Sequence, residues 1–492
     1  MNYLIGIDLG TSSTKTVLFD EDGNVIASAG KDYPLYTPNN GWAEQKPEDW
    51  RDAALETIAK VVKESGVNAD DIKGLGISGQ MHGLVMLDEN GEVIRPSIIW
   101  CDQRTEKECE EITEKIGAER LIEITANPAL TGFTASKILW VRNNEPENYA
   151  KCKHILLPKD YVRYILTGEF ATEVSDASGM QLLDVPKRQW SDEVLEKLDI
   201  DKSLLAKVYE SPEVTGTILP EIAEKTGLST STVVVGGAGD NAAAAVGTGT
   251  VGDGQCNVSL GTSGTIFISS ENFGVDPHNA LHAFAHADGH YHLMGCMLSA
   301  ASCNKWWMDT IIGTKDYEKE QEAIENLGEN HVFFLPYLMG ERSPHNDPQA
   351  RGTFIGMSMD TSRADMTQAV LEGVAFAIRD SFEVAKSLGI HIERTKICGG
   401  GAKSPLWRKI IANVLNIKVD RIASEEGPAL GGAMLAAVAD GTFASVEEAA
   451  ARIVKVVETV EPDPEIAEKY ETQYRKFVQI YPTVKALFPK LS

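Results

Sequence analysis

Two short segments in separate halves of this 492-residue chain are imperfect copies of one another. Residues 8–13 read DLGTSS and residues 259–264 read SLGTSG, and each segment follows an apolar run typical of a β-strand. Glycine lets a backbone approach a ligand closely, and hydroxyl groups with free N–H groups in such turns suit phosphate oxygens. The two loops therefore predict a duplicated domain that closes on one polyphosphate.

The length of the chain also predicts more than one domain, since a single hydrophobic core seldom grows beyond about 300 residues. Each half is expected to begin with successive strands, at 3–9, 13–20 and 24–29 in the first half and at 255–260 and 265–269 in the second. Helices and further strands then alternate, so the fold class is mixed α/β. The duplication places the boundary near residue 248, which gives domains of residues 1–247 and 248–492.

Local signals give the limits of several elements. Pro47 is expected to open a helix, Thr361 to cap a long helix, and Ser404 to cap a helix that starts at Pro405. Hairpins are expected with Asn90-Gly91 and Asp288-Gly289 at their tips. The last helix carries an aromatic stripe at helical spacing, which predicts packing against the body of the protein, with a subunit interface as the second interpretation. The stripe consists of Tyr470, Tyr474, Phe477 and Tyr481.

Composition narrows the class of protein. The formal net charge of −26 argues against nucleic acid or an anionic membrane as a partner, because both need basic patches. No stretch reaches the ~18 apolar residues that span a bilayer, and the first ten residues are typical of a strand rather than of a signal peptide. The seven cysteines form no CxxC pair, which indicates a reducing cytosol. We expect a cytoplasmic protein that holds any bound ATP locally, through backbone donors and a metal ion.

Asp8 stands where the first strand ends and the first glycine loop begins. A carboxylate there can hold Mg²⁺, usually through water, while the N–H groups of the loop bind phosphate oxygens. The alternative is that Asp8 only starts a tight turn. The second loop favours the metal interpretation, because it carries Ser259 in place of the acid. One carboxylate and two phosphate loops are what a single magnesium nucleotide requires.

A second acidic residue, Asp240, is expected at the start of an alanine-rich helix, after the apolar strand and glycine turn of residues 233–239. The structural interpretation is an ordinary helix N-cap. The functional interpretation is a general base for a hydroxyl that attacks a γ-phosphate, kept ionised by the helix dipole. The two are compatible, because capping would fix the carboxylate in place.

Two loops carry side chains that suit a polyol. SGQMHG, residues 78–83, directly follows a strand, and the carboxyl ends of strands face the ligand crevice in open α/β sheets. His82 could then bond substrate hydroxyls while Met81 shapes the wall, although a histidine after a strand also occurs for structural reasons. Trp100, Asp102 and Arg104 form a second aromatic and polar set, for which an ion pair that anchors the loop is the alternative.

Three familiar motifs do not apply. Residues 247–252 fit GxGxxG, but no strand directly precedes them and no long helix follows, so a dinucleotide site is not expected. In the histidine-rich segment 282–292, His282 and His286 would lie ~13 Å apart along one strand, opposite Tyr291 and alanines, which argues against zinc. No GxxxxGK[ST] segment occurs, which excludes a Walker A site.

Taken together, these segments resemble the FGGY carbohydrate kinases, and the resemblance covers essentially the whole chain. IDLGTSSTK looks like the first phosphate loop of the family, SLGTSGT like the second, GGGAKSPLW like the adenosine loop, and residues 351–383 like the long signature of the second domain. The resemblance implies two duplicated ribonuclease H-like domains of the actin type, with the active site in the cleft between them. It also implies ATP and Mg²⁺ as cofactors and a homodimer as the default assembly.

The resemblance assigns roles to residues of this chain. Asp240 would be the catalytic base, Asp8 would have a metal-linked role needed for activity, and both would face the metal. Met81, His82, Trp100, Asp102, Arg104, Asp240 and Asn241 would bind the sugar. The nucleotide would be held by Gly10, Thr11, Ser12, Ser13 and Lys15, by Gly261, Thr262 and Ser263, and by Gly400, Gly401, Ala402 and Ser404.

Within the family, SGQMHG with WCDQR and GAGDNAAAAVG is most similar to members that phosphorylate D-xylulose at its C5 hydroxyl. Another pentulose or gluconate remains open as the acceptor, because gluconate kinases of the family also carry a QMH segment. A gluconate site should show a cation that faces the carboxylate, and the sequence does not say whether Arg104 serves that purpose. The rival from a different class is a nucleotide-switched interaction protein of the actin or chaperone type, which needs neither a general base nor a polyol pocket.

Overall fold

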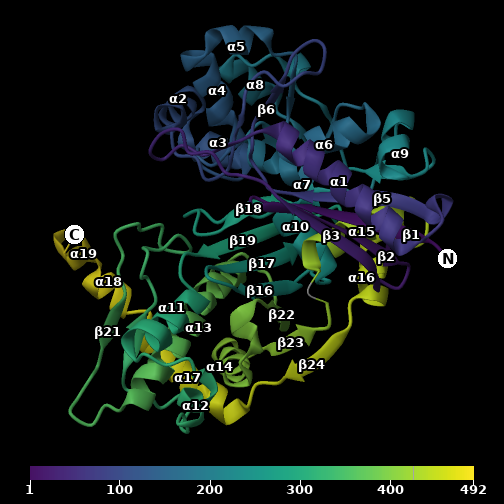
Figure 1. Cartoon of the computed structure of the whole chain (residues 1–492). Helices are drawn as coiled ribbons and strands as arrows, with labels where there is room; N and C mark the ends of the chain where they lie inside the picture. Colours follow the sequence, from purple (N-terminus) through teal and green to yellow (C-terminus); the bar gives the residue numbers. More distant parts are fainter. Residues whose placement is uncertain (425, 492) are drawn as a thin grey trace.

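A computed structural model describes residues 1–424 and 426–491, and each half of the chain builds a seven-stranded sheet in it (Figure 1). The first sheet has the order β13-β14-β5-β1-β2-β3, and β15 also pairs with β5. The second has the order β18-β19-β17-β16-β22-β23-β24. The strands of the first sheet are β1 (Tyr3–Leu9), β2 (Ser13–Asp20), β3 (Val25–Asp32), β5 (Ile72–Gly79), β13 (Val214–Thr217), β14 (Val233–Val235) and β15 (Ala238–Gly239). Those of the second are β16 (Cys256–Leu260), β17 (Gly264–Ser270), β18 (His282–Ala285), β19 (Tyr291–Met297), β22 (Arg394–Cys398), β23 (Lys418–Ile422) and β24 (Val456–Val460).

The two sheets repeat one pairing pattern, as the duplication predicts. In the first sheet β1 pairs antiparallel with β2 and parallel with β5, and in the second β16 pairs antiparallel with β17 and parallel with β22. The two hairpin tips differ in length. The Leu9–Thr14 pair encloses residues 10–13, whereas the Leu260–Gly264 pair encloses only residues 261–263. The first phosphate loop is therefore one residue longer than the second.

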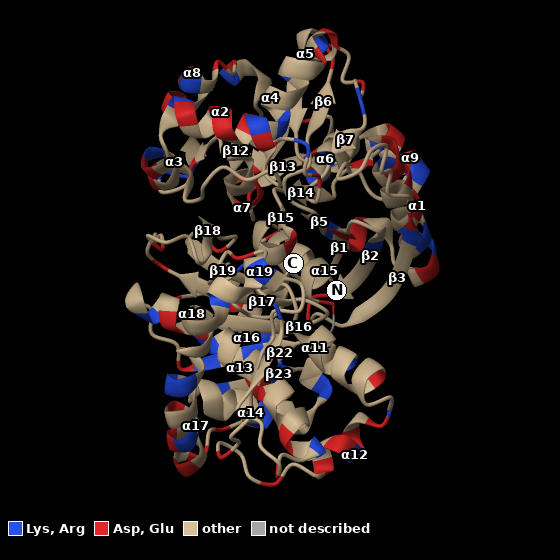
Figure 2. Cartoon of the chain, turned by 90° about the vertical axis from the view of Figure 1, so that its left-hand side faces the viewer, with Lys and Arg blue, Asp and Glu red and all other residues tan. Residues whose placement is uncertain are grey.

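Helices cover the sheets and connect the two halves. The helices used below are α1 (Pro47–Ser65), α4 (Thr134–Asn144), α6 (Pro158–Thr167), α7 (Val174–Ala177), α10 (Asp240–Gly247), α13 (Arg363–Ser387), α14 (Pro405–Leu415), α15 (Gly427–Ala439), α16 (Val446–Ile453) and α17 (Pro464–Phe477). Charged side chains mark outer helices such as α8 (Asp192–Leu198), α9 (Pro220–Thr226) and α17 (Figure 2). No helix among residues 1–424 and 426–491 combines the length and the apolar character needed to cross a bilayer.

Helix α15, from the second half of the sequence, lies directly on the first sheet. A Cβ atom added to Gly6 of β1 would lie 1.7 Å from the carbonyl oxygen of Ala429, and one added to Gly76 of β5 would lie 2.0 Å from that of Gly432. Helix α10 packs against α15 just as closely, because a Cβ on Gly431 would lie 1.9 Å from the Ala243 carbonyl oxygen. Glycine at these contacts allows backbone-to-backbone packing, which joins the two lobes below the cleft.

The expected cap of α13 is wrong by one residue, whereas Asp240 begins α10 as expected without being its N-cap. The long helix α13 is capped by Ser362, whose side chain and that of Asp365 bond reciprocally to each other's backbone N–H group. This capping box needs an acidic or amide side chain three residues after the cap, and Thr361 has Ala364 at that position. Asp240 is the first residue of α10, and Gly239 occupies the N-cap. Ser404 caps α14 as predicted, since its hydroxyl accepts the N–H of Trp407.

Both expected hairpins form, although one is short. Strands β18 and β19 flank the turn at Asp288-Gly289. The two sides of the turn at Asn90-Gly91 are joined by the Leu87–Val93 bridge and by backbone hydrogen bonds from Asp88 to Glu92 and from Ile94 to Met86, while strand β6 (Val85–Leu87) pairs with β8 (His154–Leu156). The main pairing partner of β6 is therefore β8, which lies far along the chain.

The aromatic stripe of the last helix packs on α13, as expected. Tyr470, Tyr474 and Phe477 are buried, and their rings lie 6.0, 6.1 and 5.1 Å from that of Phe376. Tyr481 lies just beyond α17 and donates to Asp347. The packing interpretation is therefore confirmed for the buried part of the stripe.

Candidate active site

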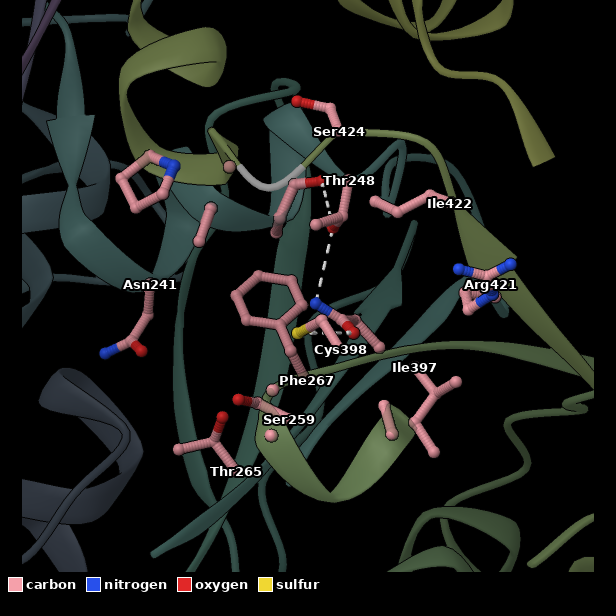
Figure 3. Close-up of a pocket in the computed structure, with 18 of the residues that line it drawn as sticks. Asn241, Thr248, Ser259, Thr265, Phe267, Ile397, Cys398, Arg421, Ile422 and Ser424 are labelled. Carbon is pink, nitrogen blue, oxygen red and sulfur yellow. Dashed lines mark hydrogen bonds between the residues drawn. The ribbon is translucent and has the colours of Figure 1, made fainter. Parts of the chain in front are cut away.

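A cavity of about 1080 Å³ opens between α10, the second sheet and the segment that leads into α15 (Figure 3). Among the residues assigned to the site from the sequence, Asn241, Gly400 and Ala402 line this cavity. Other lining residues include Thr248, Ser259, Thr265, Phe267, Cys398, Arg421, Ile422 and Ser424. Its walls mix apolar carbon with hydroxyl and amide groups, which suits a nucleoside.

The predicted adenosine loop forms one wall of the cavity. Gly399 has φ 88°, and a Cβ there would lie 2.6 Å from the carbonyl carbon of Leu260, so only glycine fits. A Cβ on Gly400 would meet no described atom within 4 Å, which leaves that residue open toward a ligand. Ser404 lies outside the cavity lining, and its hydroxyl donates to Gln321 while it caps α14. Contact of Ser404 with the nucleotide stays a prediction.

In the first phosphate loop, hydrogen-bond donors of the protein bind the backbone carbonyl oxygens. The N–H groups of the loop are left available for a ligand. The Gly10 carbonyl accepts a bond from Tyr33 Oη, and the Thr11 carbonyl accepts one from Gln45 Nε2 at 2.6 Å. The Ser12 carbonyl accepts the N–H of Tyr33 at 3.2 Å. Within the described chain, the N–H groups of Thr11 and Ser12 donate to no protein acceptor. The loop therefore carries unused donors of the kind that bind phosphate.

The second phosphate loop has the same arrangement. The Gly261 carbonyl accepts the N–H of Ala301 at 2.9 Å, and the Thr262 carbonyl accepts that of Ala300 at 3.0 Å. The N–H groups of Gly261, Thr262 and Ser263 have no acceptor among residues 1–424 and 426–491. Both loops thus offer backbone donors, and both follow the first strand of a sheet.

Asp8 faces Lys15 across the first hairpin, as its cross-strand neighbour. Lys15 Nζ lies 2.6 Å from both carboxylate oxygens of Glu426, which directly precedes α15. Burial raises the pKa of Asp8 to about 6; the Lys15 charge opposes this shift and the Glu426 charge adds to it. No described residue donates a hydrogen bond to the Asp8 carboxylate, so its oxygens are available to a cation.

Asp240 lies at the start of α10, next to Asn241 in the cavity wall. Its Oδ1 accepts the N–H of Asn241 at 2.8 Å. Burial nonetheless raises the pKa of Asp240 to about 7, and the negative charge of Asp8 raises it further, against the effect of the Asn241 bond. Desolvation thus opposes the favourable helix end, and the expectation that the helix dipole keeps this carboxylate ionised stays a prediction. A carboxyl group that titrates near neutral pH is suited to proton transfer.

His82 is held in an unusual conformation beside Asp240. Its φ is 71°, in the left-handed region, and its carbonyl oxygen accepts bonds from Thr134 Oγ1 at 3.0 Å and Lys137 Nζ at 2.9 Å. Burial and the Lys137 charge lower the pKa of His82 to about 3, so the ring is neutral. Nδ1 lies 3.1 Å from the Gly179 carbonyl oxygen, which only accepts, so the proton is assigned to Nδ1 and Nε2 is left as an acceptor for a hydroxyl.

Met81 connects the SGQMHG loop, residues 78–83, with the turn that precedes Asp240. A Cβ on Gly239 would lie 2.9 Å from Met81 Cγ, so the two loops touch. Met81 also clusters with Phe133 from the first half and Phe284 from the second. The His82 ring lies 4.7 Å from that of Phe133. These contacts bring the Met81–His82 loop against the turn that directly precedes Asp240.

The side chains of the WCDQR loop have two roles. Trp100 contacts the first phosphate loop, whereas Asp102 and Arg104 anchor their own loop. Trp100 is 46% exposed and donates to Thr11 Oγ1 of the first phosphate loop. Asp102 and Arg104 are buried as an ion pair at 2.7 Å, and Arg104 also pairs with Glu44 at 2.9 Å. This pair is the loop anchor considered as the alternative, and a direct sugar contact by either residue stays a prediction.

The motifs set aside from the sequence occupy other places. Residues 247–252 connect the end of α10 to β16. The expected register of the histidine-rich segment is wrong, since His282 lies opposite Met294 and β18 ends at Ala285, before His286. Asp288, His290 and Glu447 place ligand atoms within 4.8 Å of one another, but the Asp288 carboxylate already accepts the N–H groups of Gly252 and His290.

The sequence interpretation missed several residues of the site. Lys137 is fully buried in α4 and holds the His82 carbonyl, and the signal was a lysine directly before the apolar run ILWV. Gln45 and Tyr33 occupy carbonyls of the first phosphate loop, although they lie in a region without a motif. Glu426 reaches the cleft from the other half of the sequence, so only the folded chain brings it to Lys15.

This fold, two lobes of equal topology with paired phosphate loops and an acid at their junction, defines a two-domain α/β sugar kinase. The chain matches the N-terminal domain of the FGGY family of carbohydrate kinases over residues 3–247 and the C-terminal domain over residues 256–439. It therefore belongs to this family, and the resemblance found in its motifs is confirmed. The division at residues 247 and 248 stays a prediction.

Named relatives include xylulose kinases and a gluconate kinase. The xylulose kinase of Bacillus subtilis (strain 168) is 39% identical over 490 residues, which are 99% of this chain and 98% of that protein. The crystal structure of a ligand-bound xylulose kinase from Lactobacillus acidophilus has a TM-score of 0.93 at 27% identity and is covered over the full length of both chains. The crystal structure of a gluconate kinase from the same organism gives 0.92 at 27% identity, again over the full length of both chains.

Proposed function

We propose that this protein transfers the γ-phosphoryl group of ATP to the C5 hydroxyl of D-xylulose, giving D-xylulose 5-phosphate and ADP. The observation that carries the proposal is the place of Asp240, a buried carboxyl group at the start of α10 that directly precedes Asn241 of the cavity wall and directly follows Gly239, which lies against Met81. Similarity to xylulose kinases over nearly the whole chain supports the choice of acceptor.

In the proposed reaction Asp240 accepts the proton of the C5 hydroxyl while that oxygen attacks the γ-phosphorus in line. His82 Nε2 accepts a hydrogen bond from another sugar hydroxyl and so orients the acceptor. The free N–H groups of the two phosphate loops stabilise the charge that develops on the phosphoryl oxygens. Catalysis then consists mostly of positioning and charge stabilisation, because the transferring group is nearly dissociated at the transition state.

Asp8 and Asp240 would hold Mg²⁺. The chemistry of the site fits this ion, because both are carboxylates with raised pKa values and Asp8 has no protein donor among the described residues. When bound, Mg²⁺ neutralises the phosphate charge. It would also favour the ionised form of both acids, which places Asp240 in the state that a base requires.

Gluconate is the second candidate acceptor, since a gluconate kinase of the family is a full-length structural relative. A carboxylate acceptor needs a facing cation. Arg104 is committed to Asp102 and Glu44, and Lys137 is buried against backbone carbonyls. These contacts favour an uncharged ketose. A cytoplasmic location and a homodimer belong to the proposal as expectations from the family.

The proposal is tested by measuring ADP release with a panel of acceptors: D-xylulose, D-ribulose, L-ribulose and gluconate. We expect D-xylulose to give the highest kcat/KM, by at least tenfold over gluconate. A higher value for gluconate would replace the acceptor but leave the kinase chemistry in place. ADP release that no sugar stimulates would contradict the proposed function.

A further inference from the structure

A cluster of five charged side chains lies fully buried beneath the turn that leads into Asp240. Lys159 Nζ is 3.0 Å from Asp160, 3.0 Å from Asp176 and 3.2 Å from Glu173, and Arg163 is 2.7 Å from Asp160. All five side chains are 0% exposed. None of them belongs to the site described above.

The charges of this cluster balance at neutral pH. Burial raises the pKa of Asp176 to about 8, so Asp176 is largely protonated, whereas the cations nearby hold the pKa of Asp160 below its ordinary value. Two cations, Lys159 and Arg163, then face two anions, Asp160 and Glu173. Buried charges are tolerated only when they are paired and hydrogen-bonded, so each member depends on the others.

Glu173 connects the cluster to the turn before the base. Its two carboxylate oxygens accept the hydroxyl of Ser175 at 2.9 Å and the hydroxyl of Ser211 at 2.8 Å. The Ser175 hydroxyl in turn accepts the N–H of Gly239 at 3.1 Å. Gly239 is the N-cap of α10, and Asp240 follows it directly. The Lys159–Glu173 ion pair therefore continues, through hydrogen bonds of Glu173 and Ser175, to the residue before the base.

The rest of the same turn is held from the same side. Arg163 Nη1 donates to the Gly236 carbonyl at 2.9 Å, and the Gly237 N–H donates to the Ser211 carbonyl at 3.0 Å. The turn consists of Gly236 and Gly237 and leads into β15 (Ala238–Gly239), which also pairs with β5; these four residues have little side-chain mass to fix them. A glycine-rich segment has high conformational freedom, so its position depends on outside contacts.

We propose that the Glu173–Ser175 bridge, the hydrogen bonds from Glu173 through Ser175 Oγ to the Gly239 N–H, positions Asp240 for proton transfer. The inference rests on the proposed function, in which Asp240 is the base. Glu173 and Ser175 act through Gly239 and are positioning residues. A purely structural role, capping of the one-turn helix α7 by Glu173, is the competing explanation.

Two serines give a matched test. Ser175→Ala and Ser211→Ala each remove one buried hydroxyl from Glu173, but only Ser175 reaches the turn through its side chain. We expect both variants to lose similar thermal stability. Ser175→Ala should lower kcat 10- to 100-fold with the KM for ATP within twofold, whereas Ser211→Ala should keep kcat within threefold.

A single-turnover measurement separates positioning from general damage. With nucleotide and sugar bound at saturation, Ser175→Ala should slow phosphoryl transfer itself 10- to 100-fold, whereas in Ser211→Ala the rate of transfer should stay within threefold of the wild type. Ser175→Cys keeps the size of the side chain but bonds weakly, and it replaces Ser175→Ala if that variant does not fold. Unchanged kcat in Ser175→Cys, or equal kcat losses in the two alanine variants, would overturn the inference.

Asp240→Asn in the same assay distinguishes the two levels of the argument. If Asp240→Asn transfers phosphate at a normal rate, the proposed function fails and the bridge has no base to position. If Asp240→Asn is inactive while Ser175→Ala behaves like Ser211→Ala, only the positioning inference fails.

Discussion

Lys15 and Glu426 form an ion pair across the nucleotide cleft, with Lys15 Nζ 2.6 Å from both carboxylate oxygens. Lys15 belongs to β2 of the first sheet, and Glu426 directly precedes α15. Both side chains are partly exposed, so the pair contributes little to stability and can be exchanged for another partner. A nucleotide phosphate is such a partner, since Lys15 stands beside the first phosphate loop.

Glu426→Gln is therefore expected to strengthen nucleotide binding. The substitution frees Lys15 for phosphate and removes a charge that raises the pKa of Asp8, so this pKa should fall below about 6. We expect the Kd for ATP to fall by about 2- to 5-fold, the range of one charge contact in a partly exposed site. Calorimetric titration measures it. Glu56→Gln breaks the exposed pair with Lys31 and should change nothing; an unaltered Kd in Glu426→Gln would contradict the exchange.

Asp240 should make the folded protein less stable at alkaline pH. The folded state raises the pKa of Asp240 from 3.8 to about 7, so folding favours the protonated form. The associated stability is fully present below pH 4 and is lost as the pH rises through 7. Asp240→Asn cannot ionise and should gain on the order of 1–3 kcal/mol over the wild type at pH 8 relative to pH 4. Urea unfolding at both pH values measures the difference, and a difference of zero would show that Asp240 is not desolvated.

Substitution of Lys137 should weaken sugar binding and leave nucleotide binding unchanged. Its ammonium group donates to the carbonyl oxygens of His82 and Gly132, and so holds His82 in the left-handed conformation. Burial lowers the pKa of Lys137 to about 7, so the group is partly neutral at that pH, and loss of such a buried hydrogen bond costs about 1–3 kcal/mol. Lys137→Met is therefore expected to raise the KM for the sugar at least tenfold while the KM for ATP stays within twofold. Lys115→Met, which breaks an exposed pair with Glu111, is the control. Equal changes in both KM values would show a general loss of structure.

A larger side chain at Gly400 should impair nucleotide binding without affecting the stability of the fold. It lines the cavity, and a Cβ there would meet no described atom within 4 Å, so a larger side chain fits the folded protein but enters the space for the ligand. Gly400→Leu is expected to raise the KM for ATP at least tenfold at unchanged thermal stability. Gly274→Leu is the control, since a Cβ at that position is equally free and lies outside the cavity. An unchanged KM for ATP in Gly400→Leu would move the nucleotide elsewhere.

Much of the fold could be predicted because its signals are local. The two glycine loops, the strand patterns around them and the Ser404-Pro405 helix start each depend on a few neighbouring residues, and the structure has all three. The Thr361 cap failed because Ser362 competes for the same position with a better partner three residues on. The pairing of β6 with β8 was not predicted, because it joins segments about 65 residues apart and no local sequence pattern indicates such a contact.

Prediction of the site from the sequence was likewise limited to features that depend on neighbouring residues. Asp8, Asp240 and the phosphate loops follow from residue type and position, because glycine and carboxylate chemistry is short-range. The raised pKa of Asp240 did not follow, since desolvation depends on everything packed around the carboxyl group. Glu426, Lys137 and the bridge from Glu173 to Gly239 arise from long-range contacts and become visible only in the folded chain.

The central claim is that Asp240 is the base for phosphoryl transfer to a sugar in the cleft between the lobes. The direct measurement is rapid-quench transfer from ATP to D-xylulose by the wild type and by Asp240→Asn, with nucleotide binding measured on the same samples. We predict that binding stays within about twofold and that the rate of transfer falls by 10²- to 10⁴-fold, the usual contribution of a general base. A transfer rate within tenfold of the wild type, at normal binding, would contradict the account.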